Sequence, residues 1–188
     1  MNHAAGAKSA LTQAEIERAR RYLAETRDAL TRSIQNLSDA QWKFKPSAEC
    51  WSIGEIVEHV VIVENRVANR IFSEMPNAPA PPADRNVQEL DEIAIQQGAD
   101  RSTKFQAPVA IHPSGTWTQQ EALDRFFTSR AGIEALLQST EVDHRRHAVP
   151  HPVMGPLDGY QWILLVAAHS TRHTNQIEEL KNSPNFPG

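Results

Sequence analysis

The sequence is poor in the features that mark disulfide-linked, secreted and membrane-spanning proteins. Cys50 is the single cysteine among 188 residues, so no disulfide can form within the chain. The longest apolar run, Trp162 to Ala168, is far shorter than the ~20 residues that span a bilayer, and we interpret it as part of an amphipathic helix. Residues 1–8 lack the apolar core of a signal peptide. These absences predict a cytoplasmic protein that does not contact a membrane.

The chain also lacks an excess of positive charge. Its 19 lysines and arginines are outnumbered by 23 aspartates and glutamates, which gives a formal net charge of -4. The chain has no excess of basic residues to neutralise a phosphate backbone, so nucleic acid is not the expected ligand. The hydrophobic content of 40% is ordinary for a folded protein. The length suits one domain over residues 1–188, with residues 1–10 as a loose tail.

Helical periodicity, in contrast, runs through most of the chain. Three capping boxes and one looser cap predict four helix starts, because a polar side chain and a Glu or Gln three residues later satisfy free N–H groups. The four expected caps are Thr12, Ser52, Thr118 and Asp158. Apolar residues then recur at helical spacing. The first helix is predicted to end near Leu37 and the last near Asn182.

The segments between these helices differ in length. Residues 38–51 form a short link, which implies antiparallel neighbours, and the loop from Glu141 to Pro156 implies the same for the last two helices. About 40 residues separate the second and third helices, with a short helix expected at Val87–Gln97 and an extended crossover at Phe105–Trp117. No alternating pattern indicates a strand. We therefore predict an all-α four-helix bundle whose long crossover allows the second and third helices to be parallel.

Two histidines in the last helix are candidate metal ligands. His169 and His173 are four residues apart and share the apolar face of that helix. Burying two unpaired imidazoles is costly, and a shared metal ion is one way to satisfy both. The alternative is a pair of surface histidines without a ligand. We expect Gln176 to contact one of them and Arg172 to lie at the rim or surface.

His59 is the candidate for the third ligand that a single helix face cannot supply. It lies within the apolar stripe of the second helix, between Ile56 and Val63, where a lone histidine is usually an ordinary core residue. Its depth in that helix is compatible with meeting His169 and His173. Three neutral imidazoles suit Zn or Ni and leave positions open for water or a small-molecule substrate.

Other chemically active residues have simpler interpretations. His144, His147 and His151 could form a second metal cluster, but the prolines on both sides of His151 disfavour a chelating loop. His151 is expected to shape the entrance to the last helix instead. Glu55 precedes His59 by one turn and is expected to act as a cap. Cys50 is expected to be an inert core residue, so any nucleophile should come from outside the chain.

Beyond these spacings, the sequence resembles a known family. The segment Trp51-Ser52-Ile53-Gly54-Glu55-Ile56-Val57-Glu58-His59 is similar to the W-S-x-x-E-x-x-x-H segment of the DinB-like superfamily. Four further features resemble the C-terminal half of that family: His151-Pro152, Gly155, His169-x-x-x-His173 and Gln176-Ile177. The resemblance covers roughly residues 40–181, and the first helix matches more by position than by sequence.

The resemblance implies a four-helix bundle, often dimeric, with one divalent metal ion at His59, His169 and His173. Some members look like transferases that use a low-molecular-weight thiol, and others look like metal-dependent hydrolases. Neither DNA repair nor polymerase activity is implied. We expect thiol transfer first and hydrolysis second, with a non-catalytic metal-binding or structural bundle as the other class. The unassigned aromatic residues Phe105 and Trp117 add to the expectation of a homodimer.

Overall fold

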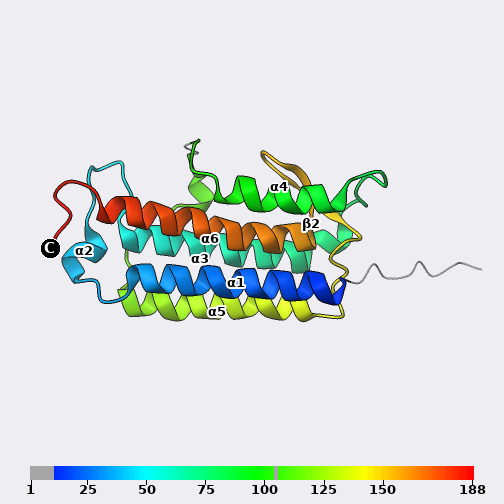
Figure 1. The fold of residues 1–188 in the computed structure, drawn as a ribbon, viewed down its shortest axis with the longest axis horizontal. Coiled ribbons are helices and arrows are strands. Elements are labelled where there is room, and N and C mark those ends of the chain that lie inside the picture. The colour runs from blue at the N-terminus through cyan, green and yellow to red at the C-terminus, as the bar shows by residue number, and fades with distance from the viewer. Residues whose placement is uncertain (1–10, 104–105) are drawn as a thin grey trace, which may run out of the picture.

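Four long helices form the body of the molecule, and the fold is all-α as predicted (Figure 1). The structure, a computed structural model, describes residues 11–103 and 106–188, so the expected tail at residues 1–10 lies outside the described residues. The bundle helices are α1 (Gln13–Ile34), α3 (Ile53–Asn69), α5 (Gln119–Gln138) and α6 (Gly159–Lys181). In Figure 1, α1 and α6 run one way and α3 and α5 the other, so the long crossover joins two parallel helices.

All four predicted helix starts are confirmed by hydrogen bonds. The side chains of Thr12, Ser52 and Thr118 each accept from the backbone N–H three residues later, where a Glu side chain accepts from the cap in return. Asp158 and Gln161 make the same reciprocal pair at the start of α6. These caps fix where each helix begins and therefore which residues face inward.

The first helix ends earlier than predicted. α1 stops at Ile34 and not near Leu37, because Asn36 adopts a φ of 59°, the left-handed conformation that ends helices. Ser38 then caps a separate short helix, α2 (Asp39–Lys43), which the sequence analysis did not predict. The Ser38 side chain accepts from the N–H of Gln41, whose own side chain returns to Ser38, so the signal was a fifth capping box.

The described part of the segment between α3 and α5 contains four short helical elements. α3 continues directly into a π-helix, Arg70–Glu74, and a 3-10 turn, Met75–Asn77. The predicted short helix is confirmed as α4 (Val87–Ala99). The crossover that follows is mostly irregular, with one 3-10 turn at Val109–Ile111.

A small hairpin contradicts the expectation of no strands. β1 (Ala148–His151) and β2 (Gly155–Asp158) pair antiparallel within the segment predicted to be a loop. Ala148 lies opposite Asp158, and Gly155 has a φ of 74° that favours glycine. Only four residues on each side take part, too few to show an alternating pattern in the sequence. The hairpin ends directly at the start of α6.

α4, the crossover and the hairpin lie together on one side of the bundle, over α3 and α6 (Figure 1). α4 approaches α6 so closely that a Cβ added to Gly98 would lie 2.7 Å from the Cβ of Ala168. Residues 162–168 of α6 are consequently all buried, and the interpretation of this run as amphipathic is wrong. Among the described residues, no helix is long and apolar enough to cross a membrane.

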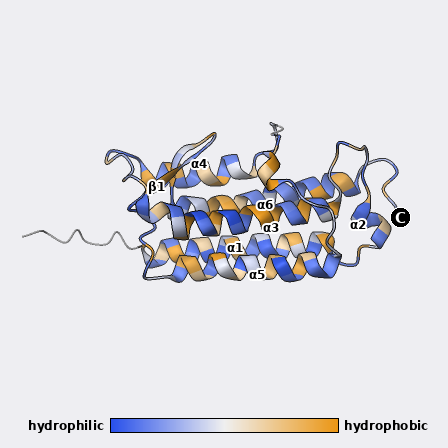
Figure 2. Ribbon diagram, turned by 180° about the vertical axis from the view of Figure 1, so that it is seen from behind, coloured by the Kyte–Doolittle hydropathy of each residue, from blue (hydrophilic) through white to orange (hydrophobic). Residues whose placement is uncertain are grey.

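The core consists of two apolar clusters, one toward each end of the bundle. One contains Leu23, Ile71 and Ile133, and the other contains Leu30, Ile56, Phe126 and Ile177. Figure 2 shows hydrophobic residues distributed along all four long helices. Buried polar residues occupy the intervening level of each helix, and they are Thr26, Glu64, Arg130 and Ser170. The candidate histidines lie beside this polar level.

Candidate metal centre

The structure brings the three candidate histidines together between α3 and α6. One ring nitrogen from each of His59, His169 and His173 lies within 4.8 Å of the others. The Nε2 atoms of His169 and His173 are 3.0 Å apart. The ring of His59 is centred 5.2 Å from that of His169 and 4.8 Å from that of His173. Nitrogens bound to one tetrahedral ion at ~2.1 Å are ~3.4 Å apart, so small side-chain movements bring these rings to ligating distance.

Two of the three rings have their orientation fixed by hydrogen bonds. Nδ1 of His59 lies 2.9 Å from the carbonyl oxygen of Ile111, and Nδ1 of His173 lies 2.8 Å from the amide oxygen of Gln176. Because these oxygens can only accept, each Nδ1 must carry the proton. The unprotonated Nε2 of each ring is then left for a ligand, as at metal sites whose histidines are held by a second hydrogen bond.

His169 is the least satisfied of the three. Its Nδ1 is buried and has no hydrogen-bond partner among the described residues, while its Nε2 faces the Nε2 of His173. A proton on His169 Nε2 can bridge that pair but cannot also satisfy the bare Nε2 of His59. A divalent ion shared by all three rings satisfies three lone pairs at once, so the residues present fit such an ion.

Burial keeps the cluster neutral. His59 and His173 are 3% and 6% exposed, and His169 is partly exposed. Loss of solvation lowers the pKa of His173 to about 3, with repulsion from His59 adding to the effect and the Gln176 hydrogen bond opposing it. The pKa of His169 is held well below its usual value, first by burial and then by His173 and His59. Burial also lowers the pKa of His59. Neutral imidazole is the form that binds a metal.

The crossover covers His59 and is itself held in place by Glu58. The Glu58 carboxylate is 3% exposed, and it accepts from the backbone N–H groups of Ser114 and Gly115 at 2.8 and 2.9 Å. This fixes the crossover on α3, where the Ile111 carbonyl meets His59. Glu58 was missed in the sequence analysis, although a carboxylate beside the apolar stripe of a buried helix was a usable signal.

The other histidines do not join a second cluster within the described residues. His144 Nε2 lies 2.9 Å from the Leu136 carbonyl oxygen, and His147 Nδ1 lies 2.6 Å from that of Ala78. His151 Nδ1 accepts from backbone N–H groups at the tip of the hairpin. The idea of a metal site at these three positions is therefore not supported, and His151 lies before α6 as expected.

The remaining predicted site residues fall as follows. Glu55 serves as a cap and forms an ion pair with Lys45 at 2.7 Å. Gln176 contacts His173, as predicted, and Arg172 is partly buried with a hydrogen bond to the Thr103 carbonyl. Cys50 is exposed, so its interpretation as a core residue is wrong. It lies in the irregular link before α3, where no apolar helix face covers it.

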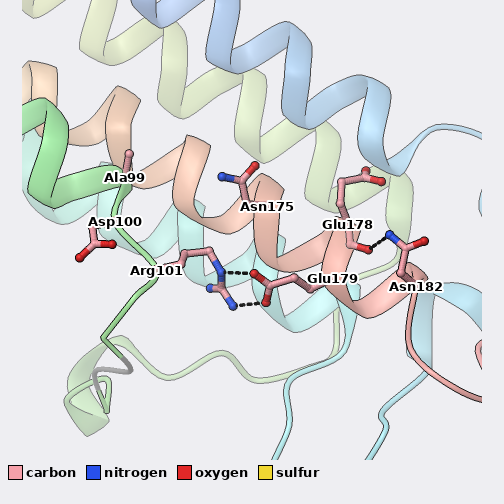
Figure 3. A pocket seen from close by; sticks show the side chains of 7 residues that line it. All are labelled: Ala99, Asp100, Arg101, Asn175, Glu178, Glu179 and Asn182. Carbon is pink, nitrogen blue, oxygen red and sulfur yellow. Dashed lines mark hydrogen bonds and ion pairs between the residues drawn. The ribbon is translucent and has the colours of Figure 1, made fainter.

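A surface hollow between α4 and α6 has a different character. Figure 3 shows it between the end of α4 and the outer face of α6, lined by polar side chains including Asp100, Asn175 and Glu178. Arg101 donates two hydrogen bonds to Glu179 across it. None of the three histidines lines this hollow. The convergence of ring nitrogens, and not the size of the hollow, identifies the candidate centre.

Comparisons with known proteins identify a family and one relative. A family model described as the DinB superfamily matches residues 9–177. The chain is 28% identical over 149 residues to a protein of Bacillus subtilis (strain 168) named uncharacterized protein YuaE, covering 79% of this chain and 88% of that protein. No solved structure matches the chain significantly.

Proposed function

The chain belongs to the DinB superfamily, and from that premise and the geometry of the histidines we propose that it is a metal-dependent transferase. Its proposed cofactor is one divalent ion, Ni or Zn, held by His59, His169 and His173. Its proposed substrates are a low-molecular-weight thiol and a small electrophilic molecule. The observation that carries the proposal is the pair of Nδ1 hydrogen bonds, which leaves Nε2 of His59 and His173 free to ligate.

The composition of the ligand set supports an activating role. Among the described residues, the group that can hold an ion contains three histidines and no carboxylate. A divalent ion held by three neutral ligands keeps its full charge and, when bound, lowers the pKa of a thiol or a water molecule beside it. Three protein ligands also leave positions open, whereas structural sites more often use four.

The residues of the chain orient and shield this centre. Ile111 and Gln176 hold the rings of His59 and His173, and the Trp51 ring packs 4.7 Å from that of His59. His169 is partly exposed, whereas His59 and His173 are buried. A substrate can therefore approach the centre from the side of His169. Cys50 is exposed, its thiol accepts a hydrogen bond from the Ser47 hydroxyl, and it is not among the residues that could hold the ion. The chain therefore offers no cysteine at the centre, and an external thiol fits the role of nucleophile.

The experiment is a conjugation assay with the metal-loaded protein. A chloro-nitroarene is incubated with and without candidate small thiols, and chloride release is measured. We expect thiol-dependent conjugation that is lost in His59→Ala and His173→Ala and retained in His147→Gln, whose ring lies outside the cluster. Full activity in the two alanine variants, once their folding is verified, would rule out the histidine centre as the catalyst.

Hydrolysis is the second candidate, because the same neutral ligand set suits activation of water. Metal-dependent ester or amide cleavage without any thiol reaction would place it first. A bundle that binds metal and is silent in both assays would be the non-catalytic alternative.

We also propose a cytoplasmic homodimer that acts on a small molecule and binds neither nucleic acid nor membrane. Phe105 lies outside the described residues. Trp117 is half-buried, packs beneath the Arg125 guanidinium and accepts a hydrogen bond from Trp42 through its carbonyl, so its ring is already occupied within the chain. The dimer therefore rests on family resemblance. Light scattering at micromolar concentration should give twice the chain mass, and a monomer mass would contradict it.

A further inference from the structure

A second group of chemically active side chains lies outside the three histidines, where the hairpin meets α6 and the end of α3. The guanidinium of Arg70 lies over the ring of Trp162, 4.7 Å from its centroid. The ring of His151 is centred 5.4 Å from that of Trp162. Arg70 begins the π-helix and His151 ends β1, so two irregular features of the fold bring these residues onto α6. π-Helical turns are frequent at functional sites.

These three side chains present donors and positive charge that the acceptors of the described residues satisfy only in part. The indole Nε1–H of Trp162 is buried in a residue only 4% exposed, and it has no hydrogen-bond partner among the described residues. His151 accepts two backbone N–H groups at Nδ1, which leaves the proton of its neutral ring on Nε2. Buried indole N–H groups usually find an acceptor, so this arrangement is unusual.

The charges around the group leave it cationic on balance. Arg70 is ion-paired through Nε with Glu74 at 3.2 Å, and the Glu74 side chain is 48% exposed, so it neutralises Arg70 only in part. Burial lowers the pKa of His151, and the charge of Arg70 lowers it further. An acceptor that bears negative charge, such as a carboxylate, is the complement of this surface.

The group lies in line with the histidine centre. Trp162 and His169 are seven residues apart on α6, which is two helical turns, so they share a face at a separation of ~10 Å along the axis. His151 is among the groups that lower the pKa of His169, after burial, His173, His59 and Arg172. This separation matches the length of a small molecule that carries a functional group at each end.

We propose that Arg70, His151 and Trp162 form a subsite for the carboxylate, or similarly anionic end, of the small molecule whose reacting end lies at the three histidines. The inference rests on the proposed function for the reacting end only. The subsite selects acidic substrates of a defined length, ~10 Å from anionic end to reacting atom. A neutral analogue of the same length lacks the negative charge that complements this group, and its hydroxyl oxygen is a weaker acceptor than a carboxylate.

The first test observes Trp162 directly and needs no activity. The four tryptophans of the chain give four indole N–H signals in a ¹⁵N-labelled protein, and Trp162→Phe identifies the signal of Trp162. The metal-loaded protein is titrated with hexanoate and, separately, with hexanol. We expect the Trp162 signal to move saturably with hexanoate and to remain fixed with hexanol. Equal movement with both compounds, or none with hexanoate, would overturn the proposal.

Two variants and a matched control make this test specific. Arg70→Gln and His151→Asn should each raise the dissociation constant of hexanoate roughly tenfold, because each removes one charge-assisted contact. Arg66→Gln removes an exposed arginine one turn earlier on α3 and should leave that constant unchanged. An equal loss in Arg66→Gln would show that general charge, and not the subsite, attracts the anion and would overturn the proposal.

The second test measures the length of the site and separates it from the proposed chemistry. Cobalt-loaded protein is titrated with mercaptoalkanoic acids of increasing chain length and with the matching mercaptoalkanols, and thiolate binding is read from its charge-transfer absorption. We expect acids to bind tighter than alcohols only when the chain spans ~10 Å. A constant preference at all lengths would overturn the link between subsite and centre. Absence of any thiolate band, with the hexanoate response intact, would refute thiol activation and leave the anionic subsite standing.

Discussion

The three candidate histidines differ in what holds their rings. A backbone carbonyl accepts from His59, a side-chain amide accepts from His173, and no described residue accepts from Nδ1 of His169. Only the second of these partners can be removed by a single conservative substitution. The amide of Gln176 is therefore the residue at which the role of ring orientation can be measured.

Gln176→Leu should weaken metal binding by about 10–100-fold, because loss of the partner that orients a ligating histidine commonly has this effect. The metal dissociation constant, measured by competition with a chromogenic chelator, checks the prediction. Asn175→Leu is the control, since it removes a neighbouring exposed amide that does not contact His173. Identical dissociation constants for both variants and the parent protein would contradict the role assigned to Gln176.

The low pKa of His173 predicts how the metal-free protein responds to acid. In the unfolded chain, His173 binds a proton as the pH falls through ~6.5. In the folded protein, its pKa of about 3 keeps it neutral at that pH. The free energy of unfolding therefore falls as the pH decreases below ~6.5, and His173 alone contributes about 2 kcal/mol of loss between roughly pH 7 and pH 5. Urea titrations of the chelator-treated protein measure this change. The change should be smaller by that amount in His173→Gln, and an unchanged pH dependence in that variant would contradict the prediction.

At the scale of elements, the crossover is the part that completes the centre. It is irregular apart from one 3-10 turn, yet Glu58 and His59 on adjacent positions of α3 both bind its backbone. Together, Glu58 and His59 hold this part of the crossover in one position against α3. The order of the crossover and the orientation of the His59 ring should therefore change together.

Glu58→Gln tests this coupling, because an amide oxygen can accept only weakly from the N–H groups of Ser114 and Gly115. We expect faster hydrogen exchange at these two amides and weaker metal binding by about tenfold through misorientation of His59. Glu121→Gln, which alters the cap of α5 on a different element, is the control. Unchanged metal affinity despite faster exchange would show that the crossover does not orient His59.

Most long elements were predictable because their signals are local. Capping boxes give the starts of all four bundle helices, and apolar periodicity places the three histidines on inward faces. The end of α1 depends on a left-handed Asn36, and the hairpin depends on pairing of two four-residue strands, so neither leaves a periodic pattern. Burial of residues 162–168 on all sides requires α4 to pack on α6, a tertiary contact that periodicity does not reveal. The contacts of Glu58 and His59 with the crossover backbone are tertiary contacts too, so the sequence pattern did not predict them.

At the scale of the whole molecule, a buried ionic level separates the two apolar clusters. Arg130 and Glu64 are each 1% exposed and form an ion pair, to which Ser129, Ser170 and Thr26 add hydrogen bonds. This network joins α1, α3, α5 and α6 at the level next to His169. It fixes the relative height of the helices that carry the histidines.

Arg130→Met should lower the free energy of unfolding by about 3–5 kcal/mol, because it leaves the Glu64 carboxylate buried without its partner. Adding Glu64→Leu removes the unpaired charge and should restore a large part of that loss. Arg20→Met, at an exposed position of α1, should have little effect. Urea unfolding measures all four proteins, and a loss below about 1 kcal/mol in Arg130→Met would contradict a structural role for the pair.

The central claim is that His59, His169 and His173 hold one metal ion, and metal content tests it most directly. Protein purified without a histidine tag is analysed by inductively coupled plasma mass spectrometry after equilibration with Ni or Zn and removal of free metal. We expect about one ion per chain, little or none in His59→Ala, His169→Ala and His173→Ala, and the full amount in His147→Gln. Folded parent protein without bound metal, or full metal content in the three alanine variants, would contradict the account.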